Sequence, residues 1–177
     1  MLGRRGSLEK GGRLPRRRRR LQIPGVNACT PSPGHPLTGG CLCGAVRYVV
    51  SGPFLRAGHC HCSRCRKHSG AAAGTQGRVR REDFRLVSGA ERLVVYRPAP
   101  EAAVKVFCEV CGSSLFGGTW PDGDEISIRL GTVDGDPGIR PQYHTFVASK
   151  AAWHEITDDL PQHPEGLPPE TGESTPA

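Results

Sequence analysis

The sequence predicts an all-β domain over residues 37–160, and two observations carry that prediction. Glycine and proline supply 24 and 16 of the 177 residues, which favours many turns and short strands over long helices. Apolar residues also recur in short alternating runs that turn residues interrupt, as half-buried strands do. The flanking segments 1–36 and 161–177 are rich in proline and polar residues without apolar periodicity, so we expect disordered tails.

The expected strands follow one another between turn signals. In chain order they span residues 45–50, 55–59, 84–87, 92–96, 103–107, 115–120, 125–130 and 142–148. Gly52-Pro53 ends the first strand, and Ser88-Gly89 separates the third from the fourth. Small residues dominate positions 69–77 and permit a ligand or a neighbouring strand to approach closely. We expect Trp153 and Ile156 to cap the core from a short helix or turn.

The positive charge of the chain is concentrated at one end. The net charge is +7, but residues 1–20 hold nine basic residues and one acidic residue, so the remainder is close to neutral. A nucleic-acid-binding domain would spread basic residues over its folded surface, which argues against that class of partner. The arginine run at residues 16–20 is either a phosphate-binding or targeting arm or a solvated tail. The lack of interleaved aromatic residues favours the tail.

The eight cysteines indicate metal chemistry. No window approaches the ~18 apolar residues of a transmembrane helix, and no apolar stretch of a secretory signal follows the arginine-rich start. We therefore expect a cytoplasmic protein with no membrane partner. In that compartment cysteines serve metal ligation or catalysis more often than disulfides. Cys29 has no cysteine near it in the sequence and is expected to be a free thiol.

The other cysteines form three clusters inside the predicted domain. They are Cys41 and Cys43 as C-x-C, Cys60, Cys62 and Cys65 as C-x-C-x-x-C, and Cys108 and Cys111 as C-x-x-C. The first and last clusters together supply the four thiolates of a closed structural zinc site, in an arrangement that resembles a zinc ribbon. Glycines beside these cysteines let the backbone wrap closely around an ion.

The middle cluster predicts a second zinc with an open coordination position. Residues i and i+2 of an extended chain point to the same face, so Cys60 and Cys62 can bind one ion. A turn at Ser63 and Arg64 then brings in Cys65 as the third ligand. Three protein ligands on a tetrahedral ion leave one position for water or substrate, which is typical of a catalytic zinc.

A histidine is the alternative fourth ligand, and it would make this second zinc structural as well. His59 and His61 alternate to the opposite face of the extended run, so they are poor candidates. His68 and His144 are within reach, and each can instead line the wall of a pocket.

Three segments resemble the glutathione-dependent formaldehyde-activating family, which includes the centromere-protein-V-like domains. They are GCLCGAVRY at residues 40–48, CHCSRCRKHSG at 60–70 and FCEVCGS at 107–113; LGTVD at 130–134, PQYH at 141–144 and AW at 152–153 resemble its C-terminal half. The resemblance implies a β-tent domain, a single zinc-stapled fold of two sheets. It also implies a structural zinc on Cys41, Cys43, Cys108 and Cys111 and a catalytic zinc on Cys60, Cys62 and Cys65.

The activity that the resemblance implies is that of a carbon–sulfur lyase. The family reaction joins glutathione, as co-substrate, to formaldehyde and forms S-hydroxymethylglutathione. An open zinc position suits this chemistry, since it binds a thiol as thiolate or polarises an aldehyde carbonyl. Arg66 and Lys67 are expected to hold the glutathione carboxylates. The alternative function is a zinc-stapled module that binds glutathione or a protein partner without turnover.

Overall fold

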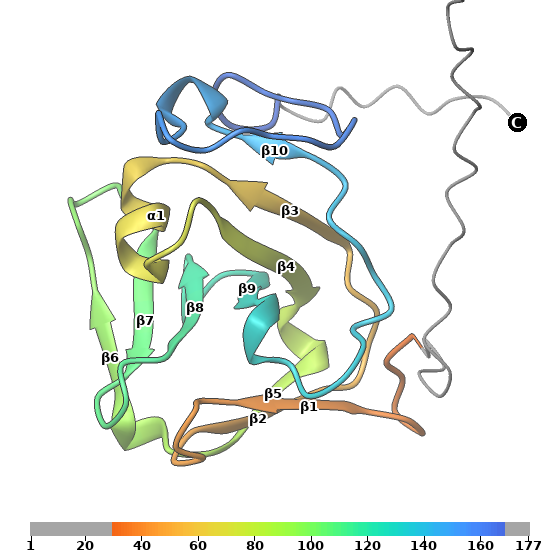
Figure 1. The fold of residues 1–177 in the computed structure, drawn as a ribbon. Coiled ribbons are helices and arrows are strands. Elements are labelled where there is room, and N and C mark those ends of the chain that lie inside the picture. The colour runs from red at the N-terminus through yellow and green to blue at the C-terminus, as the bar shows by residue number, and fades with distance from the viewer. Residues whose placement is uncertain (1–29, 169–177) are drawn as a thin grey trace, which may run out of the picture.

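Two β-sheets form the part of the chain that the computed structural model describes, residues 30–168 (Figure 1). The smaller sheet has the strand order β1-β2-β5, and the larger has the order β10-β3-β4-β9-β8-β7-β6. The predicted all-β, two-sheet class is confirmed. The predictions for Cys29, for the arginine run 16–20 and for the outer parts of both tails fall outside the described residues.

Each of the eight expected strands has a counterpart in the structure, and β1, β4 and a short helix are additions. The strands are β1 Leu37–Gly40, β2 Arg47–Val50, β3 Arg56–Cys60, β4 Gly74–Arg80, β5 Phe84–Ser88, β6 Leu93–Tyr96, β7 Val104–Cys108, β8 Ser114–Gly118, β9 Glu125–Arg129 and β10 His144–Thr145. The helix α1 spans Ser63–Ser69, and 3₁₀ turns span Arg81–Asp83, Ala90–Arg92, Leu130–Thr132 and Val147–Ser149. No helix within residues 30–168 has the length and apolar content needed to cross a membrane.

The hydrophobic core lies between the two sheets. Tyr48 of β2 packs edge-on against Phe116 of β8, with ring centroids 5.3 Å apart. Phe116 in turn stacks on Trp120 at 4.6 Å. These aromatic contacts join the smaller sheet to the larger one within the core.

The other face of the larger sheet carries polar side chains, because successive residues of a strand point to opposite faces. In β9, Ile126 and Ile128 belong to the core, so Ser127 and Arg129 point away from it. Residues opposite each other in neighbouring strands share a face. The polar face therefore contains Gln76, Arg78, Lys105, Ser127 and Arg129, whose strands pair as Gln76↔Arg129, Arg78↔Ser127, Gly117↔Ser127 and Lys105↔Gly117.

The lack of a side chain at Gly77 of β4 lets core side chains pack directly against this strand. A Cβ atom at this position would lie 2.5 Å from Cδ1 of Phe54 and 3.0 Å from Cδ2 of Leu130. At Gly77 the close approach expected within positions 69–77 is thus made to the core, whereas a Cβ at Gly74 would lie 3.0 Å from Nη1 of Arg129. We expect Gly77→Ala to lower the free energy of unfolding by ~1–3 kcal/mol, because the methyl group overpacks this region. Urea denaturation measures the change.

Gly131→Ala is the matched control, since a Cβ there meets nothing within 4 Å. Its free energy of unfolding should stay within ~0.5 kcal/mol of the natural protein's. Equal urea curves for Gly77→Ala and Gly131→Ala would contradict the packing account of Gly77.

Two expectations at the C-terminal end need correction. Trp153 is 74% exposed and does not cap the core.

The tail predicted from residue 161 begins as an ordered segment. The carbonyl of Pro161 accepts a hydrogen bond from the amide of His144 at 2.8 Å, and the carbonyl of Glu165 accepts one from the amide of Phe146 at 2.7 Å. The reason is that residues 161–165 pair with the open side of β10, a partner that local composition does not reveal.

Candidate metal centres and the adjoining cavity

The closed thiol group consists of Cys41, Cys43, Cys108 and Cys111, and it connects the end of β1 to the end of β7. All four Sγ atoms lie within 4.8 Å of one another, and none forms a disulfide. Cys43 Sγ is 3.5 Å from that of Cys41 and 3.9 Å from that of Cys108. A tetrahedral zinc with bonds of ~2.3 Å places its sulfurs about 3.8 Å apart, so this donor set fits zinc.

Tight turns hold these thiols in place. Gly44 and Gly112 have φ of 78° and 73°, values that glycine adopts without strain. The amide of Val46 donates to Cys41 Sγ at 3.2 Å. The hydroxyl of Ser113 contacts Cys111 Sγ at 3.2 Å and helps to lower the pKa of that thiol to about 5. The thiolate that zinc requires is therefore favoured at Cys111.

The second thiol group consists of Cys60, Cys62 and Cys65, whose Sγ atoms also lie within 4.8 Å of one another. Cys60 ends β3, and Cys62 is the N-cap of α1, where its Sγ accepts from the amide of Cys65 at 3.3 Å. The turn expected at residues 63–64 is thus the first turn of a helix. Cys60 and Cys65 are buried, whereas Cys62 is half-buried. The set fits a zinc ion with three protein ligands.

Neither candidate histidine joins this group. His68 packs edge-on against Phe107, with ring centroids 6.0 Å apart. Both ring nitrogens of His144 are engaged elsewhere: Nδ1 contacts Nε2 of His61 at 2.8 Å, and Nε2 contacts a carboxylate oxygen of Asp158 at 3.0 Å. Within residues 30–168, the second group therefore consists of three thiols and no imidazole.

A histidine cluster lies on the opposite face of the ligand strand, as the alternation of His59 and His61 predicts. His59 stacks on His144 with ring centroids 4.9 Å apart, and His154 stacks on His61 at 5.6 Å. Burial lowers the pKa of His61 to about 4, which keeps its imidazole neutral. Sequence reasoning missed the cluster as a whole, because the parallel pairing of β10 with β3 brings His144 there.

A cavity of about 510 Å³ opens beside the second thiol group. Its polar wall comes from the face of the larger sheet that points away from the core, and its lining includes Arg64, Arg78, Lys105 and Arg129 against one acidic residue, Glu101. Lys105 and Arg129 are each only 6% exposed. The cavity is therefore strongly cationic and suits an anionic ligand.

One cation of the cavity contacts a thiol of the second group directly. The ammonium of Lys105 donates to Cys65 Sγ at 3.3 Å. Hydrogen bonds from the thiols of Cys60 and Cys62, together with the charges of Lys105 and Arg129, hold the pKa of the Cys65 thiol far below its usual range. A thiolate at Cys65 is the form that binds zinc.

Arg66 and Lys67, expected to hold substrate carboxylates, are not among the residues that line this cavity. Arg66 donates instead to the carbonyls of His61 and Ser149, both at 3.1 Å, and Lys67 is exposed. The reason is the helical turn: with Cys65 facing inward, the next two residues of α1 rotate away. The sequence signal that could have identified the cations of the cavity is a single basic residue inside an apolar strand, such as Lys105 between two valines.

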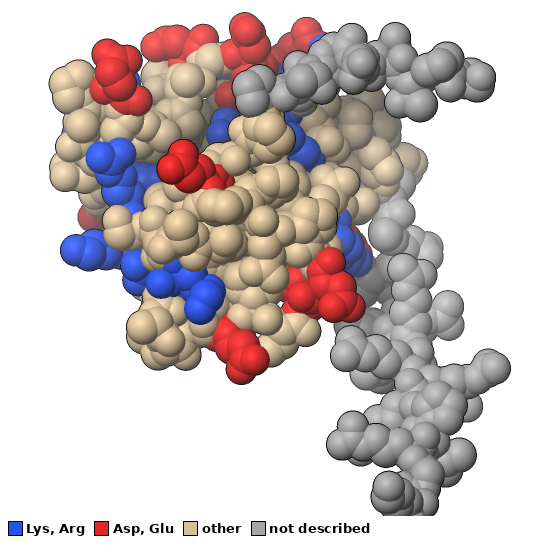
Figure 2. All heavy atoms as spheres, turned by 90° about the horizontal axis from the view of Figure 1, so that it is seen from above, with Lys and Arg blue, Asp and Glu red and all other residues tan. Residues whose placement is uncertain are grey.

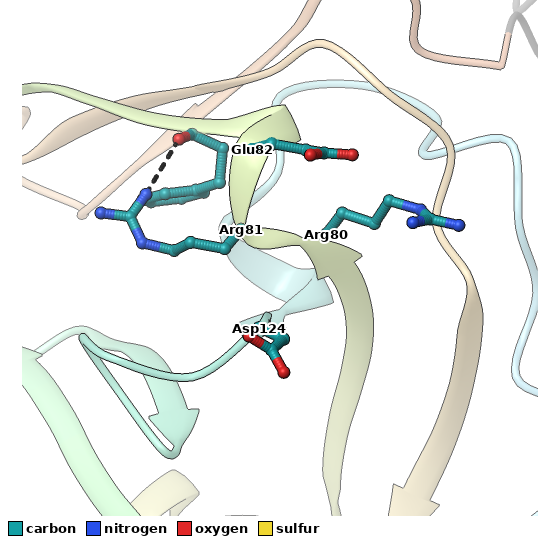
Figure 3. Close-up of a pocket in the computed structure, with 5 residues that line it drawn as sticks. Arg80, Arg81, Glu82 and Asp124 are labelled. Carbon is teal, nitrogen blue, oxygen red and sulfur yellow. Dashed lines mark hydrogen bonds between the residues drawn. The ribbon is translucent and has the colours of Figure 1, made fainter.

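The surface does not show one continuous basic face from above. In that view basic side chains occur in separate groups, and acidic side chains lie between and around them, several along the upper rim (Figure 2). A second hollow of about 510 Å³, at the end of β4, is lined by Arg80, Arg81, Glu82, Phe84 and Asp124 (Figure 3). Arg81 donates there to the carbonyls of Phe84 and Pro121, both at 3.3 Å. This hollow has mixed charge and no thiol, so the thiol-lined cavity is the better candidate for chemistry.

Comparison with known proteins decides the family. The profile of the family described as glutathione-dependent formaldehyde-activating enzyme matches residues 36–149. The chain belongs to this family. The resemblance inferred from the cysteine segments is thereby confirmed. The glutathione-dependent formaldehyde-activating match includes all seven clustered cysteines and the buried cations of the cavity, and it ends before His154 and Asp158.

Two relatives illustrate the similarity. A curated protein of Halomonas elongata, provisionally named a glutathione-dependent formaldehyde-activating enzyme, is 30% identical over 128 residues, which are 68% of this chain and 80% of that protein. A crystal structure of a Rhodobacter sphaeroides protein is 31% identical, with a TM-score of 0.47 over 55% of this chain and 88% of that one.

Proposed function

We propose that the protein is a zinc-dependent enzyme that joins glutathione, or a similar thiol, to formaldehyde or another small aldehyde. With formaldehyde the product is the S-hydroxymethyl thiol, and the reverse reaction is that of a carbon–sulfur lyase. Membership of the family supports the substrates. The observation that carries the proposal is the position of the three-thiol group at the wall of a cationic cavity, with Cys62 partly open to it.

The reaction needs no oxidant or reductant. A bond forms between the thiol sulfur and the aldehyde carbon, and the proton lost by the thiol is balanced by one gained at the former carbonyl oxygen. A zinc ion on Cys60, Cys62 and Cys65 would supply a Lewis-acid position for a thiolate or a carbonyl oxygen. Lys105 and Arg129 place two buried positive charges beside it and stabilise negative charge on the reacting sulfur and oxygen.

The closed thiol group supports this geometry through β7. Cys108 ends the strand, and Lys105 lies three residues earlier on it. A structural zinc on Cys41, Cys43, Cys108 and Cys111 would fix the end of β7 against the smaller sheet. It would thereby also fix the position of the Lys105 side chain in the cavity. We therefore propose two zinc ions with different tasks.

Proton NMR exchange spectroscopy tests the proposal. At equilibrium in a mixture of formaldehyde and glutathione, catalytic amounts of the zinc-loaded protein should accelerate exchange between free and S-hydroxymethylated glutathione. An equal concentration of zinc salt should not. An unchanged exchange rate, combined with glutathione binding by calorimetry, would instead identify a binding module without turnover.

A further inference from the structure

Arg78 lies at the junction of two cavities, and it has no ionic partner in the part of the chain that the structure describes. It lines the cavity beside the second thiol group and also a neighbouring one of about 220 Å³; the two cavities share Gln76, Arg78 and Phe146. No ion pair to Arg78 occurs within residues 30–168. The nearby carboxylate of Glu125 is paired elsewhere, because its two oxygens accept from Arg56 at 2.9 and 2.6 Å.

The fold holds the Arg78 guanidinium in this position. Val79, the next residue of β4, is in the core, so Arg78 points to the cavity side of the sheet. A Cβ atom on Gly118 would lie 2.7 Å from Arg78 Nη1, so the missing side chain leaves room for the guanidinium. Burial lowers the pKa of Arg78, yet a guanidinium stays charged in proteins. A partly desolvated charge without a counter-ion favours an anionic ligand.

Gln76 presents hydrogen-bond donors at the same junction. Its amide oxygen accepts from Arg129 Nη1 at 2.7 Å and from the hydroxyl of Ser127 at 3.3 Å. Because a guanidinium only donates, the amide atom that faces Arg129 must be the oxygen. The NH₂ group of Gln76 is then left without a partner in the described part of the chain, in a side chain that lines both cavities.

We propose that Arg78 and the NH₂ group of Gln76 form a carboxylate subsite, which selects thiols that carry a carboxylate remote from the sulfur. The inference rests on the proposed function and assigns specificity-determining residues to the same cavity. The sulfur end lies at Cys62, a carboxylate pairs with the Arg78 fork, and the smaller cavity accepts the part of the molecule beyond it. A planar guanidinium matches a carboxylate in a bidentate pair.

The test compares an anionic thiol with a neutral one. Glutathione and 2-mercaptoethanol are each assayed with formaldehyde on the zinc-loaded full-length protein, and their binding is measured by calorimetry without aldehyde. The variants are Arg78→Met, which removes the charge, and Arg78→Lys, which keeps the charge without the fork. Arg80→Met is the matched control, because Arg80 lies two residues along β4, is exposed and lines the separate hollow of Figure 3.

Arg78→Met should raise KM and Kd for glutathione about 10- to 100-fold with little change in kcat, since one charge-assisted pair is lost. For Arg78→Lys, KM and Kd for glutathione should lie between the values of Arg78→Met and those of the natural protein. Neither variant should change the constants for 2-mercaptoethanol more than about twofold, and Arg80→Met should leave both thiols unaffected. Thermal denaturation confirms that each variant is folded, and Arg78→Lys decides the matter if Arg78→Met does not fold.

The outcomes separate this inference from the function on which it rests. An equal loss with both thiols, or no loss with glutathione, overturns the carboxylate subsite. A natural protein that does not bind glutathione overturns it as well. Binding that depends on Arg78 without any acceleration of exchange supports the subsite and overturns the proposed enzyme.

Discussion

Cys62→Ser is expected to abolish turnover and to remove one of two zinc ions from a protein that still folds. Cys62 belongs only to the three-thiol group and is half-buried at the cavity wall, so its loss leaves the core between the sheets intact. A serine hydroxyl can replace the sulfur as N-cap acceptor for the amide of Cys65. It is a poor zinc ligand, and kcat/KM should fall more than about 100-fold.

Native mass spectrometry counts the ions, and the exchange assay measures the rate. Lys67→Ala is the control: this exposed residue of the same helix does not line the cavity, so both ions and the full activity should remain. A Cys62→Ser protein that kept two ions and its activity would show that the three-thiol group is not the catalytic centre. A loss of activity in Lys67→Ala would restore the original expectation that this lysine binds substrate.

Cys108→Ser should have the largest effect on stability. This side chain is fully buried at the end of β7, where its Sγ belongs to the closed four-thiol group. The variant would lose the structural zinc proposed for this group and would leave the remaining thiols around an incomplete site. Because metal binding to a folded site contributes directly to folding, we expect a loss of more than ~4 kcal/mol and a fall in Tm of about 10 °C or more.

Thermal denaturation with and without a chelator checks the origin of this loss. The natural protein should lose stability when the chelator is added, whereas Cys108→Ser should respond much less, since the stabilising ion is already gone. A variant with the natural Tm, or one that the chelator destabilises as much as the natural protein, would contradict a structural zinc at these four cysteines.

The thiol groups could be predicted from the sequence because their spacing is short. Two cysteines separated by one or two residues can bind the same ion in almost any local conformation. The pairing of Cys41 with Cys43 could therefore be predicted without knowledge of the fold. The union of this pair with Cys108 and Cys111 followed from the count of ligands that a closed site requires. Eight strands could be predicted for a similar reason, since alternation within five or six residues is a local property, whereas β1 and β4 were missed.

The cations of the cavity could not be predicted in the same way. Arg78, Lys105 and Arg129 come from three strands that meet only through the sheet order β4-β9-β8-β7. Arg66 and Lys67 were close to the thiols in sequence, but the helix α1 turns them away. That helix has only seven residues and one buried side chain, too little for a periodic signal.

The strand β7 connects the two thiol groups, because it contains a cysteine of the closed group and a lysine that contacts the second group. β7 carries Cys108 at its end and Lys105, which touches Cys65, in its middle. If the closed group holds the proposed structural zinc, loss of that ion would therefore also displace a charge beside the proposed catalytic group. Activity would then need both ions at once, and it would respond more steeply to the zinc supply of the cell than an enzyme with one independent site.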